Sequence, residues 1–286
     1  MADHGSLFNA AGGRTLNIAH RGARSLAPEN TLAAARKALE AGADMWELDV
    51  GMTADGQLVV IHDASLVRSS NARSIYPERS PWLVHDFSLE ELRRLDCGGW
   101  FGEQDPFGQI AAGRISADVV ESYRGEKLPT LREALEFTVA NDWLVNVEIK
   151  DLSGAVGDAV IVEQVVDLVA ELGAVERVIV SSFNEDYLRR AKLADRRLVT
   201  GWLVAARPKD VVETLRRLGA QSYHPRIGAL EMSEIPSLQA QGFQVLVWGE
   251  NDVEAMKALL AAGADGIFTD FPQELAKLLK EFRGRE

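Results

Sequence analysis

Histidine, arginine and acidic side chains stand in or directly after several short apolar runs of the sequence. The stretch IAHRGARSLAPENT places His20 and Arg21 at the end of such a run. A second run, MWELDV, carries Glu47 and Asp49. Imidazoles transfer protons, guanidinium groups bind anions and carboxylates bind cations. These residue types at these positions therefore predict a polar site built on the ends of strands.

The same arrangement recurs further along the chain. The run LVVIHD ends in His62 and Asp63, and LVNVEIK carries Glu148 and Lys150. The run FQVLVW ends in Trp248. The ends of neighbouring parallel strands meet at one edge of a sheet. Groups at several strand ends therefore favour one shared site over unrelated positions.

A period of two places the carboxylates on one face of a strand. Glu47 and Asp49 flank Leu48, and alternate side chains of a strand point to the same side. Glu148 lies in a later strand of the same kind. Three carboxylates gathered on an inner face repel one another and lose hydration, which needs compensation. A hard divalent cation with oxygen ligands is the simplest compensation, so we expect a metal site.

Two histidines and two cations beside such a metal would complete the equipment for phosphoester cleavage. Arg21 and Lys150 suit an anionic substrate, and His20 and His62 could move protons on opposite sides of a reacting centre. Taken singly, a Glu-x-Asp pair, a His-Asp pair or a strand-end lysine is more often ordinary structure. The prediction rests on their coincidence at the same end of successive strands.

Eight short β-rich runs, each leading to a helical pattern, must position these groups. The runs are LNIA, MWELDV, LVNVEI, RVIVSS, LVTGWLV, QSYH, FQVLVW and GIFT. Eight strand–helix units predict an α/β fold, a (β/α)₈ TIM barrel forming one catalytic domain over residues 1–286. One of the helical patterns is MSEIPSLQAQG at 232–242. A doubly wound open sheet is the alternative, but no G-x-G-x-x-G follows the first strand to favour it.

Two segments fall outside this count. Residues 53–63 predict the returning arm of a hairpin, because the link to the second strand is too short for a parallel crossover. Residues from about 64 to 127 have no clear period, and we expect an insertion after strand 2 that lies over the C-terminal face and narrows the entrance. Within it, Trp100, Phe101 and Phe107 predict either a small core of the insertion or an apolar rim for an acyl chain.

Composition limits the classes of partner. The chain has 31 Lys and Arg against 43 Asp and Glu, a formal net charge of −12, which disfavours nucleic acid and anionic membranes. No run of ~18 apolar residues predicts membrane insertion, and the N-terminus lacks the pattern of a signal peptide, so we expect a cytoplasmic protein. The single cysteine, Cys97, excludes an intrachain disulfide. The oligomeric state stays open.

A long, ordered set of motifs resembles the glycerophosphodiester phosphodiesterase family. In chain order these are AHRG, APENT, ELDV, TADG, VVIHD, LPTLREAL, VNVEIK, SSFN, VLVWGEND and GIFTDFP, spanning about residue 16 to 275. The resemblance implies a TIM barrel that hydrolyses glycerophosphodiesters to sn-glycerol 3-phosphate and an alcohol. It also implies one divalent metal ion as cofactor, with Mg²⁺ or Ca²⁺ favoured and Mn²⁺ as an alternative. The partner would be a small-molecule glycerophosphodiester.

The resemblance further implies a role for each candidate residue. His20 and His62 would be the acid/base pair, and Glu47, Asp49 and Glu148 would bind the metal ion. Arg21 and Lys150 would bind the phosphate. Glu29 and Asn30 would brace the His20 loop, and Trp248 would form the pocket wall. The chain departs from the family pattern at WGEN, where Trp-Thr-Val-Asn is common, and in an extra stretch of the insertion. Both departures bear on substrate choice more than on reaction type.

Two other functions are compatible with the residues. A phospholipase D-like relative would cleave lysophospholipids and use an apolar rim in the insertion. A catalytically inactive barrel would only bind phosphodiesters or a partner, although no expected catalytic group is missing from the sequence. Substrate assays with and without a chelator distinguish these alternatives from a metal-dependent glycerophosphodiesterase.

Overall fold

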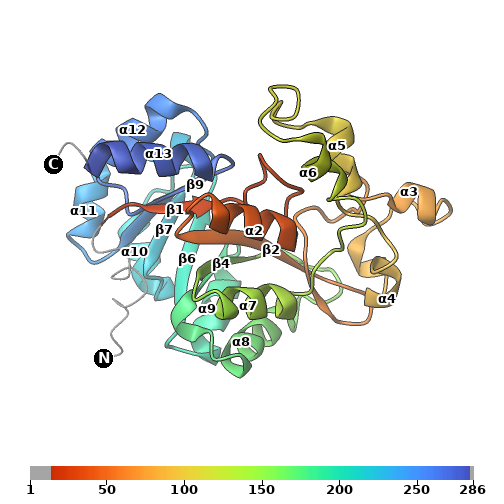
Figure 1. Ribbon diagram of the computed structural model, residues 1–286. Coiled ribbons are helices and arrows are strands. Elements are labelled where there is room, and N and C mark those ends of the chain that lie inside the picture. Colours follow the sequence, from red (N-terminus) through yellow and green to blue (C-terminus); the bar gives the residue numbers. More distant parts are fainter. Residues whose placement is uncertain (1–13, 284–286) are drawn as a thin grey trace.

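The structure, a computed structural model, describes residues 14–283 and is built on a closed ring of parallel strands (Figure 1). Pairing of β1 with β2 closes the sheet, so the predicted (β/α)₈ TIM barrel is confirmed. The strands of the ring are β1 (Leu16–Ala19), β2 (Met45–Met52), β4 (Leu144–Ile149), β5 (Val178–Ser182), β6 (Val199–Val204), β7 (Ser222–Pro225), β8 (Gln244–Val247) and β9 (Gly266–Thr269). The N-terminal segment on which the signal-peptide prediction rests falls largely outside the described residues.

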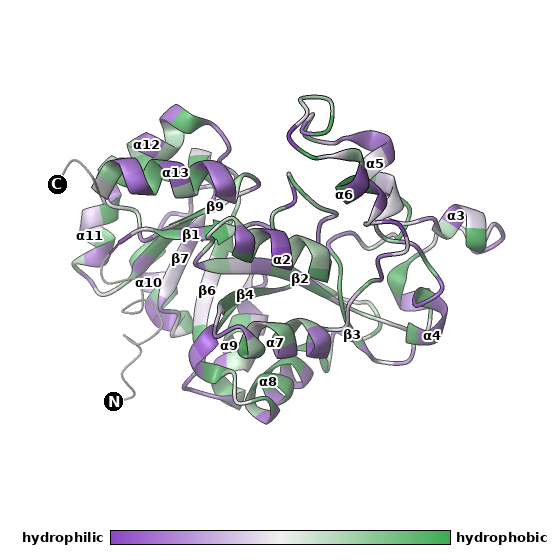
Figure 2. Cartoon of the chain, in the orientation of Figure 1, coloured by the Kyte–Doolittle hydropathy of each residue, from purple (hydrophilic) through white to green (hydrophobic). Residues whose placement is uncertain are grey.

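Helices follow the strands and cover the outside of the ring (Figure 1). They are α2 (Leu32–Glu40), α7 (Leu131–Ala140), α8 (Ile161–Glu171), α9 (Glu185–Ala194), α10 (Val211–Leu218), α11 (Ile235–Gln239), α12 (Val253–Ala261) and α13 (Pro272–Arg283). Figure 2 shows both hydrophilic and hydrophobic residues along α12 and α13, as expected for helices with one face on a core. Within residues 14–283, no helix has the length and hydropathy needed to cross a membrane.

One helix is shorter than its sequence pattern predicts. Instead of a continuous helix over 232–242, a 3₁₀ turn (Met232–Glu234) precedes α11. Pro236 lies in the first turn of α11. Proline lacks an N–H and fits only the first turn of an α-helix, so the helix begins just before it.

Alternation along β2 separates the barrel interior from the helical layer. Met45 belongs to an apolar cluster inside the ring, whereas Trp46 packs in the outer cluster beneath the helices. The Trp46 Nε1–H donates to Thr138 Oγ1 of α7 at 2.9 Å, which fixes the outward direction. Glu47 and Asp49 alternate with these outward residues and therefore face the interior.

The register between β2 and β4 brings their polar residues side by side. Glu47 is paired with Asn146, and Asp49 with Glu148. Adjacent strands lie about 4.8 Å apart, so paired side chains on one face are in contact distance. The predicted grouping of acidic residues thus follows from strand register alone.

The hairpin and the insertion follow the C-terminal end of β2. Strand β3 (Leu58–Val60) returns antiparallel to β2, which confirms the hairpin but makes its arm shorter than residues 53–63. The insertion contains α3 (Ala72–Ile75), α4 (Leu89–Leu92), α5 (Gly99–Gln104) and α6 (Ala117–Glu121), which lie together beyond β2 in Figure 1. The Tyr123 hydroxyl donates to the carbonyl of Leu26, so the insertion also contacts the β1–α2 loop.

Two insertion aromatics form core. Trp100 and Phe101 are 9% and 1% exposed and pack in a buried cluster of the insertion and α2. Of the two alternatives, core packing is therefore observed for these two residues and the apolar rim is not, because their rings are already covered. Phe107 is half-buried, with its ring edge-on to Phe271 at 5.5 Å between centroids.

Gly201 of β6 provides a test of the packing inside the barrel. A methyl group there would overlap the buried ring of His224, which Ser222 holds by a hydrogen bond at Nε2 (2.9 Å). We expect Gly201→Ala to lower the free energy of unfolding by roughly 1–3 kcal/mol in urea denaturation, because overpacked cores strain. Gly228→Ala is the control, since Gly228 is exposed with no atom within 4 Å of an added methyl. Equal denaturation midpoints for the two variants would contradict this packing.

Candidate active site

A pocket of about 150 Å³ gathers most of the predicted site residues. Its lining residues are His20, Arg21, Glu47, His62, Asn146, Glu148, Lys150, Phe183, Leu203, Trp248 and Phe268. The predicted residues Glu29, Asn30 and Asp49 do not line it. They bond to the loop and strand that carry its wall, as the contacts below show.

Glu47, Asp49 and Glu148 converge beside this pocket. One oxygen from each lies within 4.8 Å of the others, and all three side chains are buried or nearly so. Glu47 Oε1 and Asp49 Oδ1 are buried without a hydrogen-bond partner. Such orphaned oxygens are costly, and carboxylate oxygens are the ligands that hard divalent cations prefer. The residues present therefore fit a divalent metal ion.

Crowding shifts the pKa values of the three carboxyl groups in opposite directions. Burial, reinforced by Asp49 and Glu148, raises the pKa of Glu47 well above its ordinary value. Burial and Asp49 likewise raise the pKa of Glu148. Burial also acts to raise the pKa of Asp49, but Arg21 and Lys150 outweigh it and hold that pKa below its usual range. Burial and the neighbouring carboxylates thus oppose the ionisation of Glu47 and Glu148, which a bound cation would favour.

Arg21 ties the loop after β1 to this cluster. Its backbone N–H donates to Glu47 Oε2 at 2.8 Å, and its Nη1 donates to Glu29 Oε1 at 2.8 Å. Its Nε lies 3.2 Å from Asp49 Oδ2. The backbone of Arg21 has a φ of +54°, a left-handed conformation that residues other than glycine rarely adopt. The carboxylates on either side of the guanidinium hold it in this conformation.

The start of α2 packs against the same turn. Gly22 lies so close that a Cβ there would be 2.7 Å from Ala34, which only glycine permits. Thr31 caps α2 by accepting from the Ala34 N–H. Asn30 donates through its backbone N–H to the Arg21 carbonyl and through its side chain to Asp49 Oδ2 (2.8 Å). Asn30 therefore contacts both the turn and the acidic cluster.

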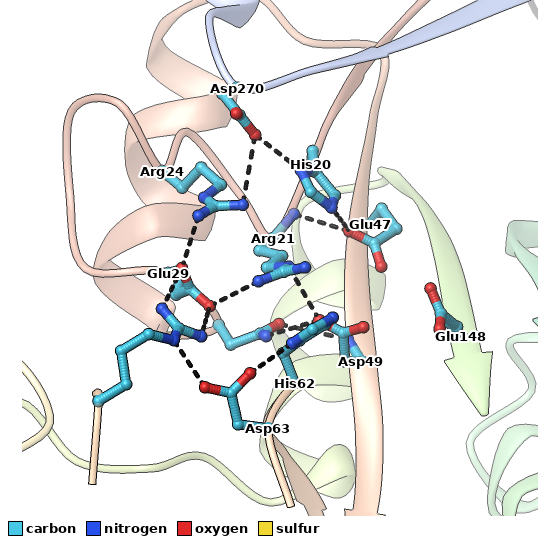
Figure 3. Close-up of polar contacts among 12 residues, drawn as sticks. His20, Arg21, Arg24, Glu29, Glu47, Asp49, His62, Asp63, Glu148 and Asp270 are labelled. Carbon is cyan, nitrogen blue, oxygen red and sulfur yellow. Dashed lines mark hydrogen bonds and ion pairs between the residues drawn. The ribbon is translucent and has the colours of Figure 1, made fainter. Parts of the chain in front are cut away.

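Both histidines are held through Nδ1 (Figure 3). His20 Nδ1 lies 2.7 Å from Asp270 Oδ1, and His62 Nδ1 lies 2.6 Å from Asp63 Oδ1. A carboxylate accepts hydrogen bonds, so Nδ1 carries a proton in each ring and Nε2 remains free. Nε2 of His20 lies 4.0 Å from Glu47 Oε2. The free nitrogen of His20 is therefore on the side of the acidic cluster, and both rings line the pocket.

The environment of His20 sets the protonation of both the imidazole and its partner Asp270. Burial lowers the pKa of His20, more than its contact with Asp270 raises it. Burial raises the pKa of Asp270, but His20, Arg24 and Asn251 lower it to about 2. Asp270 is therefore ionised at neutral pH and is a fixed acceptor for the Nδ1 proton.

Glu29 joins three arginines beneath the site. Besides Arg21, it accepts from Arg68 at 3.0 Å and 2.7 Å and lies 3.0 Å from Arg24 Nη2. Burial raises the pKa of Glu29, but Arg68, Arg21 and Arg24 lower it to about 2. The predicted supporting residue is thus an ionised carboxylate around which three cations are arranged.

Sequence reasoning missed three of these charged residues. Asp270 lies in the motif GIFTDFP, and Arg24 lies between the motifs AHRG and APENT, so their positions in or beside these motifs were an available signal. Arg68 lies in the insertion outside every quoted motif, and only its bonds in the structure reveal it.

Lys150 and Trp248 occupy the remaining walls. Lys150 Nζ donates to Glu148 Oε1 at 2.7 Å and lies 3.4 Å from Asp49 Oδ1. Trp248 donates from Nε1 to the carbonyl of His224, and its ring stands edge-on to Phe183. The pocket therefore has a charged side and an aromatic side. A neighbouring pocket of about 170 Å³ shares His62 and Lys150 and extends toward the insertion residues Val84 and His85.

Comparison with known proteins gives a consistent result. The chain matches the Glycerophosphoryl diester phosphodiesterase family over residues 20–274. It is 37% identical to a glycerophosphodiester phosphodiesterase of Caldanaerobacter subterraneus subsp. tengcongensis, over 94% of this chain and 99% of that one. It is 33% identical to the enzyme of the same name from Bacillus altitudinis, over 93% and 98% of the two chains.

A solved structure agrees with the sequence matches. An Oleispira antarctica phosphodiesterase, in complex with the product sn-glycerol-3-phosphate, superposes with a TM-score of 0.75. The two chains are 28% identical, with 92% of this chain and 96% of the other covered. Because the family match includes every strand end that carries a candidate residue, the chain is an enzyme that belongs to the glycerophosphoryl diester phosphodiesterase family.

Proposed function

We propose that the enzyme hydrolyses glycerophosphodiesters to sn-glycerol 3-phosphate and an alcohol, using one divalent metal ion and two histidines. The observation that carries this proposal is a single pocket lined by two histidines, each anchored through Nδ1, beside a cluster of three carboxylates. The product named in the solved relative supports the substrate class.

Glu47, Asp49 and Glu148 would hold the metal ion, with Mg²⁺ or Ca²⁺ favoured and Mn²⁺ as an alternative. When bound, the ion would neutralise the carboxylates and polarise a phosphoryl oxygen. Arg21 and Lys150 both line the pocket beside Asp49 and would bind the remaining phosphoryl oxygens. Trp248 would line the wall against the organic part of the substrate.

His20 and His62 would carry out the two proton transfers. One Nε2 takes the proton of the attacking oxygen, while the other Nε2 gives a proton to the leaving alkoxide as its bond to phosphorus breaks. The attacking oxygen belongs to water, or to the substrate's own glycerol hydroxyl followed by hydrolysis of the cyclic phosphate. Asp270 and Asp63 occupy Nδ1 in both rings, so Nε2 is the nitrogen that exchanges protons.

Lysophospholipid cleavage has less support. The burial of Trp100 and Phe101 leaves Phe107 alone of the three aromatic residues that motivated it. A comparison of glycerophosphocholine with lysophosphatidylcholine tests the two substrate classes, and we expect faster turnover of glycerophosphocholine. The alternative of a non-catalytic barrel is disfavoured by the family match, and both candidate histidines line the pocket.

Removal of the metal ion should abolish hydrolysis. After EDTA treatment, release of sn-glycerol 3-phosphate from glycerophosphocholine should cease, and Mg²⁺ or Ca²⁺ should restore it. The ion should also raise the melting temperature, because it binds the native state alone. Glu148→Gln should lose most of this rise, whereas Glu121→Gln, an exposed acid of α6, should respond like the wild type. Full activity in EDTA would contradict the metal site.

Each histidine should be essential for turnover. We expect His20→Ala and His62→Ala to lower kcat by about 10²–10⁴-fold, because each removes one proton transfer. The rise in melting temperature on adding metal should persist in both variants. His85→Ala, in the insertion, is the control and should change kcat little. Near wild-type turnover of glycerophosphocholine by either His20→Ala or His62→Ala would end the two-histidine mechanism.

A leaving group that needs no proton should separate the acid from the base. We expect a p-nitrophenyl glycerophosphodiester to restore turnover in the variant that lacks the acid, because p-nitrophenolate leaves unprotonated. The variant that lacks the base should stay slow with this substrate. If kcat falls by the same factor in both variants with both substrates, the two histidines do not act separately as acid and base.

A further inference from the structure

We infer that Arg68, a residue of the insertion, is a positioning residue for His62: it fixes the carboxylate of Asp63, which in turn orients the imidazole. This inference rests on the proposed role of His62. It gives the insertion a role in positioning His62, in addition to the expected role in narrowing the pocket entrance.

The contact between Arg68 and Asp63 completes a short relay. Asp63 Oδ1 accepts from His62 Nδ1 at 2.6 Å, and Asp63 Oδ2 accepts from Arg68 Nε at 2.6 Å. Each oxygen of this carboxylate therefore has its own partner, and rotation of the group would break one bond or the other. Figure 3 shows Asp63 below and to the left of the His62 ring, joined to it by a dashed line. The His62 ring is thus oriented only as firmly as Asp63 is held.

The other end of the Arg68 guanidinium is anchored on a buried group. Nη1 and Nη2 donate to the two oxygens of Glu29 at 3.0 Å and 2.7 Å. Glu29 is only 5% exposed and is also held by Arg21 and Arg24. A guanidinium is a planar fork, so a bidentate bond on one edge fixes the direction of Nε on the other. Arg68 therefore transmits the rigid position of Glu29 to Asp63.

The backbone beside Arg68 is also fixed by the insertion. Leu66 is fully buried, and its N–H donates to the carbonyl of Trp82 at 3.0 Å. The Ser70 hydroxyl donates to the carbonyl of Leu66 at 2.6 Å. These bonds on both sides of Arg68 hold the segment from which its side chain reaches the site.

Geometry rather than charge should dominate the effect. The Arg68 side chain is 39% exposed, so water screens its field at His62. The hydrogen bonds that set the angle of the Asp63 carboxylate are not lost through screening. A lysine carries the same charge but cannot bridge both carboxylates as a planar fork, which separates the two contributions.

His20 is held by different groups. Its partner Asp270 accepts from Asn251 at 2.8 Å, and the nearest arginine to Asp270, Arg24, is 3.6 Å away. Arg68 makes no bond to Asp270 among the contacts of the described residues. Loss of Arg68 should therefore act on the proton transfer of His62 and not on that of His20.

The test begins with Arg68→Gln and Arg68→Lys, assayed with metal-loaded enzyme and glycerophosphocholine. We expect Arg68→Gln to lower kcat by about 10- to 100-fold with KM little changed, because a misplaced proton-transfer group slows chemistry more than binding. Arg68→Lys should recover only part of the loss. The matched control is Arg79→Gln, since Arg79 has the same exposed fraction, lies in the insertion and pairs with Glu91 at 2.9 Å away from the site. Arg79→Gln should keep kcat at the wild-type value.

The decisive step is a double-mutant cycle that includes both histidines. If Arg68 acts through His62, Arg68→Gln costs almost nothing further in a His62→Ala background but its full factor in a His20→Ala background. Equal factors in both backgrounds, or a normal kcat for Arg68→Gln while His62→Ala is impaired, would overturn the inference alone. Wild-type kcat for His62→Ala would instead overturn the proposed function. Melting temperatures of all variants show whether any loss comes from unfolding.

Discussion

Three carboxylates held together at one end of the barrel are the constraint on which the rest of the site depends. The paired register of β2 and β4 puts Asp49 beside Glu148, and period-two alternation adds Glu47 to the same face. Buried carboxylates at this spacing oppose one another's ionisation unless positive charge is close. The left-handed backbone of Arg21 follows from this requirement, since in that conformation its N–H and guanidinium both reach the cluster.

The positive charge that compensates the acidic cluster belongs to a network in which arginines and carboxylates alternate away from the cluster. Arg21 shares Glu29 with Arg24 and Arg68, and those two arginines lead toward Asp270 and Asp63, the partners of the histidines. A single buried carboxylate on the β1–α2 loop therefore stands between the acidic cluster, both imidazoles and the insertion. Because each member satisfies its neighbours, such a network is expected to be rigid when complete.

Periodicity and strand order were sufficient to predict the barrel, the β2–β3 hairpin and the acidic cluster. Glu47 and Asp49 could be assigned to the interior because they alternate with the apolar Trp46 and Leu48, and the structure packs both of these in the outer cluster. The start of one helix was predicted less well. The proline that shortens α11 is plain in the sequence, yet the apolar spacing around it still predicted a longer helix.

The partner of His20 and the contact between Glu29 and Arg68 could not be derived in the same way. The link from His20 to Asp270 spans 250 positions, and that from Glu29 to Arg68 spans 39. No period connects such pairs, since ring closure and loop packing bring them together. The burial of Trp100 and Phe101 was equally undetermined, because aromatic residues without a period fit a core or a surface rim.

The most direct test of the central claim is a calorimetric titration of the metal-free enzyme with Mg²⁺ or Ca²⁺. The account predicts that one ion binds per chain, and that the double variant Glu47→Gln, Glu148→Gln no longer binds it. Amides have nearly the same shape as carboxylates but lack the charge that a hard cation requires. No binding by the wild type, or unchanged binding by the double variant, would contradict the assignment of this carboxylate cluster as the metal site.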